Sequence, residues 1–468
     1  MKKIRLLLCL GVCFPWLNLF SQTSSFPSYD QDLLTPDFFK GRRDAVREKL
    51  PDSSMCVLFS APERNKSNDV NYTYHQDPNF YYLTGFTEAN SVLIIYKEKH
   101  TISGKSVNEI LFIPARNAGK EQWTGRMASP ENASRISGIE IVLPTNEFND
   151  YPLEYNSMKW ILRMKFPKGM TDDRKDNEDV YSLVEHFKLN SGFPSGADDD
   201  FKLGKILTTL REVKLEEEIV LMKKAISISI AGHLEMMRAL EPGFSEYKTQ
   251  AVGEYIFKSE GSEATGYPSI CGGGENSCIL HYESNRKPLK SGELILLDMG
   301  AEYHGYTADI TRTLPVNGKF TGEQQQIYEL VFQAQEAAFL VCQPGNKFTD
   351  PHQQAKEVLS QGLMKLGIIR EPEELNTYFM HGTSHYLGLD AHDAGTYSAL
   401  KAGNIITIEP GIYIPEGSPC DPRWWKIGIR LEEDVLITED GHEVLSGALP
   451  RKWQDVEKTM LEKSIFNK

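Results

Sequence analysis

Residues 381–393, HGTSHYLGLDAHD, concentrate groups that can bind metal ions or move protons. The stretch holds His381, His385 and His392 together with two aspartates. Neutral imidazole is both a metal ligand and a general acid or base near neutral pH, although a histidine-rich stretch could equally be a solvated loop. Whether this stretch is a reactive site or a solvated loop therefore depends on whether the rest of the chain supplies further ligand groups.

Two aspartates interrupt otherwise apolar strand patterns in residues 294–313, LILLDMGAEYHGYTADITRT. If the chain turns at residues 303–304, Asp298 and Asp309 face each other across a hairpin, with β-carbons about 5 Å apart. Two carboxylates that close repel each other and resist burial, and a cation between them removes both costs. The alternative is that each aspartate ends a strand in contact with water.

Two glutamates repeat this conflict further along the chain. In NIITIEPG, Glu409 follows three isoleucines and shares a strand face with Ile405 and Thr407. In GIRLEEDVLI, alternation of side chains places Glu432 in the middle of a strand. Mid-strand acids that face solvent are common, so neither glutamate alone predicts a site.

Together these groups form a ligand set for two divalent cations. Four carboxylates carry four negative charges, which two such ions neutralise, and a neutral imidazole from residues 381–393 adds one nitrogen ligand. Oxygen-rich ligation favours Mn²⁺ and its neighbours over a structural zinc, which prefers cysteine and histidine. Two metals about 3.5–4 Å apart can hold the hydroxide that acts as nucleophile in hydrolases.

Helices and strands that could carry these groups alternate in the second half of the chain. The strand patterns lie at residues 292–300, 308–316, 404–414 and 428–438. The helical patterns cover residues 214–240, 321–342 and 349–368, and Thr321 with Gln324 forms a capping box. We expect an antiparallel sheet covered by helices, an α+β domain, over residues 206–450.

The first half has the pattern of an α/β domain. Apolar runs rich in β-branched residues predict buried strands at residues 53–61, 91–97 and 108–116. Residues 151–205 are rich in charge and predict a loop-heavy connection with one short helix. We therefore expect an N-terminal α/β domain over residues 22–205, which includes this connection, and a C-terminal tail over residues 451–468.

The first 21 residues have the three parts of a secretory signal peptide. A basic start, MKKIR, precedes an apolar run and a small, polar region with a cleavage position near Ser21. The apolar run is shorter than the roughly twenty residues of a comfortable membrane span, although a retained anchor is the alternative. We expect export to the periplasm or the medium, and no later segment predicts a membrane span.

Composition narrows the class of protein further. The formal net charge of −14 and the pI near 5.4 argue against nucleic acid as a partner, because phosphate binding needs a basic face. Five of the seven cysteines lie beyond the signal peptide and are scattered, which predicts buried free thiols and not a disulfide framework.

The five ligand candidates, in this order, resemble the dinuclear metallopeptidases of the pita-bread fold, and among them the Xaa-Pro aminopeptidase (aminopeptidase P) family. The resemblance extends from about residue 38 to residue 445. Six sequence words carry it: LDMGAEYHGYTADITRT, HGTSHYLGLDAHD, TIEPGIY, GIRLEED, GYPSICGGGENSCILHY and NDVNYTYHQDPNFYYLTGF. It implies a creatinase-like N-terminal α/β domain, a pita-bread catalytic domain and a homo-oligomer.

The resemblance also implies roles for individual residues. Asp298 would bind one metal ion, His385 and Glu409 the other, and Asp309 and Glu432 would bridge both. Glu409 would also act as general base toward the bridging water.

Further roles concern residues around the ligands. His392 would stabilise the tetrahedral intermediate, and His281 and His381 would line the cleft near the proline subsite. Tyr413 and Arg430 would support the ligands.

The implied activity is release of the N-terminal residue from peptides with proline in the second position. Such a bond lacks the amide N–H that general peptidases bind, and its ring restricts the backbone, so the enzyme needs a pocket for the ring. Three alternatives remain: a prolidase that accepts only dipeptides, a metal-free peptide-binding module, and a creatinase-like hydrolase of a small amidine. The five ligand types oppose the last two.

Overall fold

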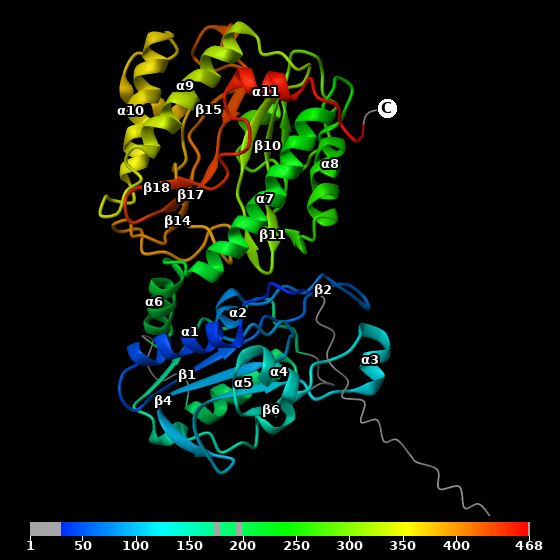
Figure 1. The fold of residues 1–468 in the computed structure, drawn as a ribbon, viewed down its shortest axis with the longest axis vertical. Helices are drawn as coiled ribbons and strands as arrows, with labels where there is room; N and C mark the ends of the chain where they lie inside the picture. The colour runs from blue at the N-terminus through cyan, green and yellow to red at the C-terminus, as the bar shows by residue number, and fades with distance from the viewer. Residues whose placement is uncertain (1–29, 173–177, 193–198, 467–468) are drawn as a thin grey trace, which may run out of the picture.

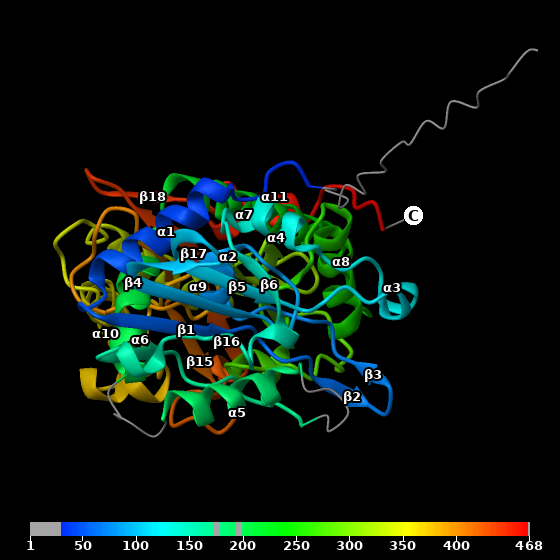
Figure 2. The ribbon, with the colours of Figure 1, turned by 90° about the horizontal axis from the view of Figure 1, so that it is seen from below.

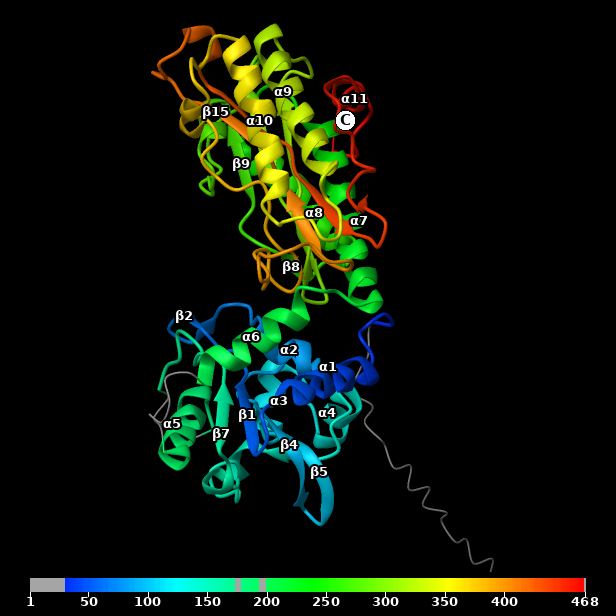
Figure 3. The same ribbon diagram turned by 90° about the vertical axis from the view of Figure 1, so that its left-hand side faces the viewer.

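The computed structural model describes residues 30–172, 178–192 and 199–466, which form two domains joined by helix α6 (Asp199–Arg211) (Figures 1 and 3). The expected signal peptide lies outside the described residues. The boundary expected after residue 205 falls inside α6, so this helix is shared between the domains. Within the described ranges, no helix is long and apolar enough to cross a membrane.

The N-terminal domain is a mixed sheet with helices on both faces, as its α/β pattern predicts (Figure 2). Helices α1, α2 and α4 pack on one face, and α5 packs on the other. The strand order is β6-β5-β4-β1-β7, with β1 Ser54–Phe59, β4 Val92–Ile102, β5 Lys105–Ile113, β6 Val142–Pro144 and β7 Trp160–Arg163. The other elements are α1 Pro36–Lys49, β2 Asn65–Ser67, β3 Val70–Asn71, α2 Pro78–Thr84, α3 Ala118–Thr124, α4 Pro130–Ser137 and α5 Val180–Ser191.

The three strands predicted in this domain are confirmed as β1, β4 and β5. The interpretation of residues 151–205 as mostly loop is wrong in one respect, because β7 pairs in parallel with β1 and forms the sheet edge. A strand of four residues is too short to show a periodic pattern. The short helix expected in this segment is present as α5.

The C-terminal domain is an antiparallel assembly of short strands covered by helices, as expected (Figure 1). Its strands are β8 Ala264–Thr265, β9 Ile270–Gly273, β10 Leu294–Asp298, β11 Ala301–Tyr303, β12 Tyr306–Thr307, β13 Thr311–Pro315, β14 Ile405–Ile408, β15 Gly411–Ile414, β16 Ile427–Arg430, β17 Glu433–Ile437 and β18 His442–Val444. Its helices are α7 Glu216–Ala239, α8 Glu246–Ser259, α9 Gly322–Phe339, α10 Asp350–Lys365 and α11 Trp453–Thr459. The three predicted helices are thus confirmed as α7, α9 and α10.

Local signals account for the helix ends. Thr321 Oγ1 accepts a hydrogen bond from the Gln324 backbone N–H, and Gln324 Oε1 accepts one from the Thr321 backbone N–H, which confirms the predicted capping box. The expected C-terminal tail contains α11, and Ser464 Oγ donates to Glu235 Oε1 at 2.6 Å, so this segment packs on the C-terminal domain.

The aspartate hairpin turns one residue later than predicted. His304 and Gly305 take φ values of 49° and 81°, which make a two-residue turn, and Glu302 pairs with Thr307. Asp298 therefore lies opposite Thr311, not opposite Asp309. A register change of two positions keeps side chains on the same face, so the two aspartates become diagonal neighbours.

Two long strand patterns are each split in the structure. Pro410 lacks a backbone N–H, and the chain breaks there between β14 and β15. Between β16 and β17 the Glu432 N–H donates to the Thr311 carbonyl at 3.1 Å, outside both ladders. The mid-strand position predicted for Glu432 is therefore wrong, because this residue occupies the junction of two strands.

The five cysteines among the described residues form no disulfide. Cys56, Cys271 and Cys342 are buried free thiols, as predicted, whereas Cys278 and Cys420 are free but only half-buried.

Candidate metal centre

One cavity of about 600 Å³ in the C-terminal domain is lined by nearly all of the predicted site residues. Strand ends, the strand junction and the loop of residues 381–393 all contribute to its wall. The predicted residues that line it are Asp298, Asp309, Glu409, Glu432, His385, His281, His381, His392 and Arg430. Tyr413 is buried behind this wall and bonds to two of its members.

The aspartates come from the hairpin. Asp298 is the last residue of β10 and Asp309 lies between β12 and β13, and both are less than a tenth exposed. The Tyr267 hydroxyl lies 2.7 Å from Asp298 Oδ1 and 2.6 Å from Asp309 Oδ1. One hydroxyl carries one proton, which the two carboxylate oxygens share.

Sequence reasoning did not identify Tyr267 as a site residue. It lies in the segment GYPSICGGGENSCILHY, about thirty residues before Asp298, and its distance along the chain does not indicate a contact with the aspartates. Only the packing of this segment against the hairpin brings its hydroxyl between the two carboxyl groups.

The imidazole of His385 points at the carboxylates. Its backbone is held against β14, because Thr407 N donates to the His385 carbonyl at 3.0 Å and His385 N donates to Thr407 Oγ1 at 3.1 Å. Its Nδ1 lies 3.1 Å from the Tyr386 carbonyl, which leaves Nε2 for the cavity. Nε2 is 3.5 Å from Asp309 Oδ2, 3.7 Å from Glu409 Oε1 and 4.0 Å from Glu432 Oε1.

The electrostatics of this cluster favour a cation. Burial and the neighbouring carboxylates raise the pKa of Asp309 and of Glu409 far above the usual range, and raise the pKa of Glu432 to about 8. Burial lowers the pKa of His385 to about 4, so its imidazole is neutral and free to ligate. Ligand atoms of Asp309, His385 and Glu432 lie within 4.8 Å of one another, a separation that fits a bound ion.

The remaining predicted residues surround these ligands. Arg430 forms an ion pair with Asp298 and donates from Nη1 to the Tyr413 hydroxyl at 3.0 Å. His381 places Nε2 at 2.8 Å from the same hydroxyl. The ring centre of His392 lies 4.5 Å from that of His385. His281 contributes to the lining of the cavity.

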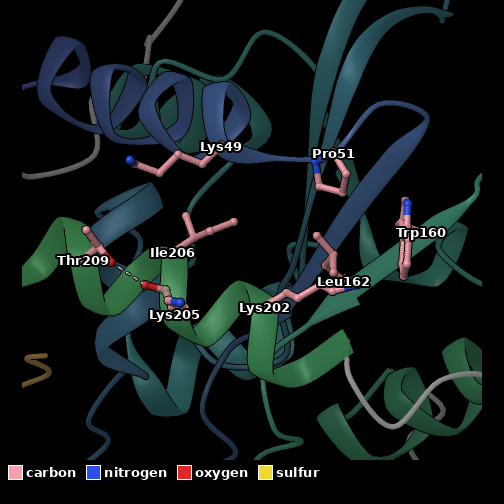
Figure 4. A pocket seen from close by; sticks show the side chains of 8 residues that line it. All are labelled: Lys49, Pro51, Trp160, Leu162, Lys202, Lys205, Ile206 and Thr209. Carbon is pink, nitrogen blue, oxygen red and sulfur yellow. Dashed lines mark hydrogen bonds between the residues drawn. The ribbon is translucent and has the colours of Figure 1, made fainter.

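A second cavity, of about 410 Å³, lies in the N-terminal domain between α1, β7 and α6 (Figure 4). Three lysines and apolar side chains line it, and Lys202 Nζ lies 3.4 Å from the ring centre of Trp160. Its lining includes no carboxylate and no imidazole, so this second cavity offers no comparable set of metal ligands.

Comparison with known proteins agrees with this division of the chain. Residues 220–439 match the model of "Metallopeptidase family M24", and residues 39–159 match "Aminopeptidase P, N-terminal domain". The chain belongs to metallopeptidase family M24, and it is a metal-dependent aminopeptidase.

Individual relatives match along almost their whole length. The chain is 33% identical over 436 residues to the Xaa-Pro aminopeptidase of Escherichia coli (strain K12), which covers 90% of this chain and 97% of that protein. Among solved structures, a putative aminopeptidase P from Bacillus anthracis is 34% identical with a TM-score of 0.81 and covers 92% of this chain and all of that one. Proline aminopeptidase P II from Yersinia pestis is 33% identical with a TM-score of 0.80, covering 91% and 99%.

The expectations of family, fold class and hydrolytic activity are therefore confirmed. The comparisons do not favour the prolidase alternative.

Proposed function

We propose that this aminopeptidase releases the N-terminal residue from peptides with proline in the second position and uses two Mn²⁺ ions. The observation that carries the proposal is the convergence of four carboxylates and one neutral imidazole in a single cavity. The names of the relatives support the substrate class. The oxygen-rich ligand set supports Mn²⁺.

Within this proposal, Asp298 would hold one ion, His385 and Glu409 would hold the other, and Asp309 and Glu432 would serve as ligands to both. When bound, such ions polarise the scissile carbonyl and lower the pKa of water.

The chain supplies the proton transfers and the orientation of the substrate. Glu409 reaches the cavity with a side chain 17% exposed and accepts a proton from the attacking water. As the C–N bond breaks, this proton passes to the departing proline nitrogen. His392 donates a hydrogen bond to the oxygen on which negative charge develops. Tyr413, bonded to Arg430, orients His381 beside the substrate.

The cavity also offers a place for the proline ring. Pro268, Ile270 and Leu280 provide apolar surface in its lining, beside His281. Because the Xaa-Pro bond has no N–H to donate, recognition has to rest on the shape of the ring and on the free amino terminus of the peptide.

A metal-exchange assay tests the proposal. The purified protein is stripped with a chelator, reloaded with Mn²⁺, Mg²⁺ or Zn²⁺, and given an Xaa-Pro-Pro tripeptide, an Xaa-Pro dipeptide and an Xaa-Ala-Pro control. We expect Mn²⁺ to restore cleavage of the tripeptide before proline, with no cleavage of the alanine peptide. Cleavage of the dipeptide alone would identify a prolidase instead.

The proposal also includes the export of the protein and its oligomeric state. The N-terminal pattern of residues 1–21 supports export and cleavage near Ser21, which N-terminal sequencing of the protein from expressing cells tests. We also propose a homo-oligomer, and light scattering of the purified protein tests it. A monomeric mass would contradict that proposal.

A further inference from the structure

A buried cluster of charges lies directly behind the loop that carries His385 and His392. Arg211 at the end of α6, Lys214 in the link to α7, and Asp393 each have side chains no more than 4% exposed. Lys214 Nζ donates to Asp393 Oδ2 at 2.9 Å, and Arg211 forms an ion pair with the other oxygen of the same carboxylate. Such a triad is costly to bury, and each member depends on the others for compensation.

The Arg211 guanidinium also joins the two domains. Its Nη1 donates to Asn79 Oδ1 in α2 of the N-terminal domain at 2.8 Å. Its Nη2 donates to Asp390 Oδ2 at 3.0 Å, so the same guanidinium contacts both Asp390 and Asp393 of residues 381–393, here called the histidine loop. One planar cation with several donors suits this branched contact better than an ammonium.

The histidine loop is folded around the Asp393 carboxylate. Asp393 N donates to the Tyr386 carbonyl at 2.8 Å, which closes the segment between the two histidines. A β-carbon on Gly388 would lie 2.2 Å from Asp393 Oδ2, so the backbone passes directly over the carboxylate. Beyond Tyr386, which bridges to Ile406, residues 387–393 belong to no helix or strand.

We propose that Arg211, Lys214 and Asp393 are positioning residues that hold His392, the neighbour of Asp393 in the chain, at its place beside the ligand His385. Through Asn79 the same cluster makes the N-terminal domain a structural part of the catalytic centre. The inference deepens the proposed function, and it rests on the role given there to His392.

The first test uses Arg211→Ala, Lys214→Met and Asp393→Asn in the full-length, metal-loaded enzyme. We expect kcat to fall about 10²-fold, the effect of misplacing a catalytic group by about 1 Å, while KM and bound metal stay within about twofold of wild type. Guanidinium at millimolar concentration should restore part of the activity of Arg211→Ala, because it can refill the vacated position. Wild-type kcat in these variants would overturn the proposal.

A matched control separates positioning from a general loss of stability. Arg43 is an equally buried guanidinium in the N-terminal domain, where it pairs with Glu109 and donates to the Leu83 and Ser137 carbonyls. Arg43→Ala should lower the melting temperature by a similar amount and leave kcat unchanged. An equal loss of kcat in both variants would show that Arg211 is merely structural.

A spectroscopic readout makes the inference independent of the substrate assignment. With ¹⁵N-labelled histidine and diamagnetic Zn²⁺ in place of Mn²⁺, the signal assigned through His392→Asn should move in Arg211→Ala and stay in place in Arg43→Ala. Unmoved His392 resonances would refute positioning. If instead the wild-type enzyme failed to cleave Xaa-Pro peptides while the signal moved, the proposed substrate would be wrong and the positioning cluster would stand.

Discussion

The acidic side and the histidine side of the metal centre are held in place in different ways. Asp298, Glu409 and Glu432 each stand at the end of a strand or at a strand junction, so antiparallel ladders determine their spacing. His392 stands in a segment without regular structure, behind which lies a cluster of buried charges. Strand register is a property of one sheet, whereas the position of the loop depends on contacts that reach into the N-terminal domain.

Substitutions should therefore have different consequences on the acidic side and on the histidine side of the metal centre. A changed ligand on the strands should remove metal and activity together. A change on the loop side should alter the rate while the metal stays bound.

The largest effect is expected from Asp309→Asn, which removes a carboxylate from the centre of the cluster. Hydrolysis should fall by at least about 10³-fold, because this side chain would contact both ions. Bound metal, measured by mass spectrometry, should fall as well. The exposed Asp440→Asn serves as control, and wild-type activity in Asp309→Asn would refute the site.

The next largest effect is expected on the loop side. His392→Asn should lower kcat by about 10²-fold, the usual cost of losing one hydrogen-bond donor to a developing oxyanion. Metal content should equal that of wild type, in contrast to Asp309→Asn. Loss of metal together with activity would mean that His392 acts as a ligand and that the two sides do not differ.

Tyr267→Phe examines the residue that links the two aspartates. Loss of its hydroxyl should weaken metal binding by about 10- to 100-fold, which is typical for groups that orient ligands. Titration with Mn²⁺ during the assay measures this shift, and saturating metal should restore most of kcat. A low kcat that excess metal does not restore would indicate that the hydroxyl contacts the substrate.

The smallest effect concerns His304 at the tip of the aspartate hairpin. Burial alone lowers the pKa of this imidazole, but hydrogen bonds and charges from Glu263 and from Asp32 outweigh burial and raise it above 6.5. The stabilisation is therefore fully present below pH about 6.5 and is lost as the pH rises through the raised pKa.

Thermal unfolding of wild type and His304→Asn measures this loss. Asparagine tolerates the positive φ of the turn, so the variant removes the charge and keeps the backbone. The melting temperature of wild type should exceed that of the variant at pH about 6, by about 2–4 °C for each kcal/mol. The gap should narrow toward pH about 9, and a gap that does not depend on pH would contradict the role of the imidazolium.

Local sequence patterns were sufficient to predict the long helices and the chemistry of the candidate ligands. Helices α7, α9 and α10 show periodic apolar positions and clear ends, and a carboxylate beside isoleucines and leucines is too costly to bury without a purpose. Short strand β7, the breaks around Glu409 and Glu432 and the shifted hairpin turn were not predictable in this way. Each of these features depends on which distant segment supplies the hydrogen-bond partners of the strand, and the local sequence does not show this.

The amino-acid sequence by itself determined which groups are candidates to bind metal and in what order they follow along the chain, because side-chain chemistry and burial cost are local properties. Only the tertiary structure decided that Tyr267 joins the two aspartates and that Arg211 ties Asp393 to the N-terminal domain. These contacts join residues far apart in the chain, and their geometry results from how whole elements pack.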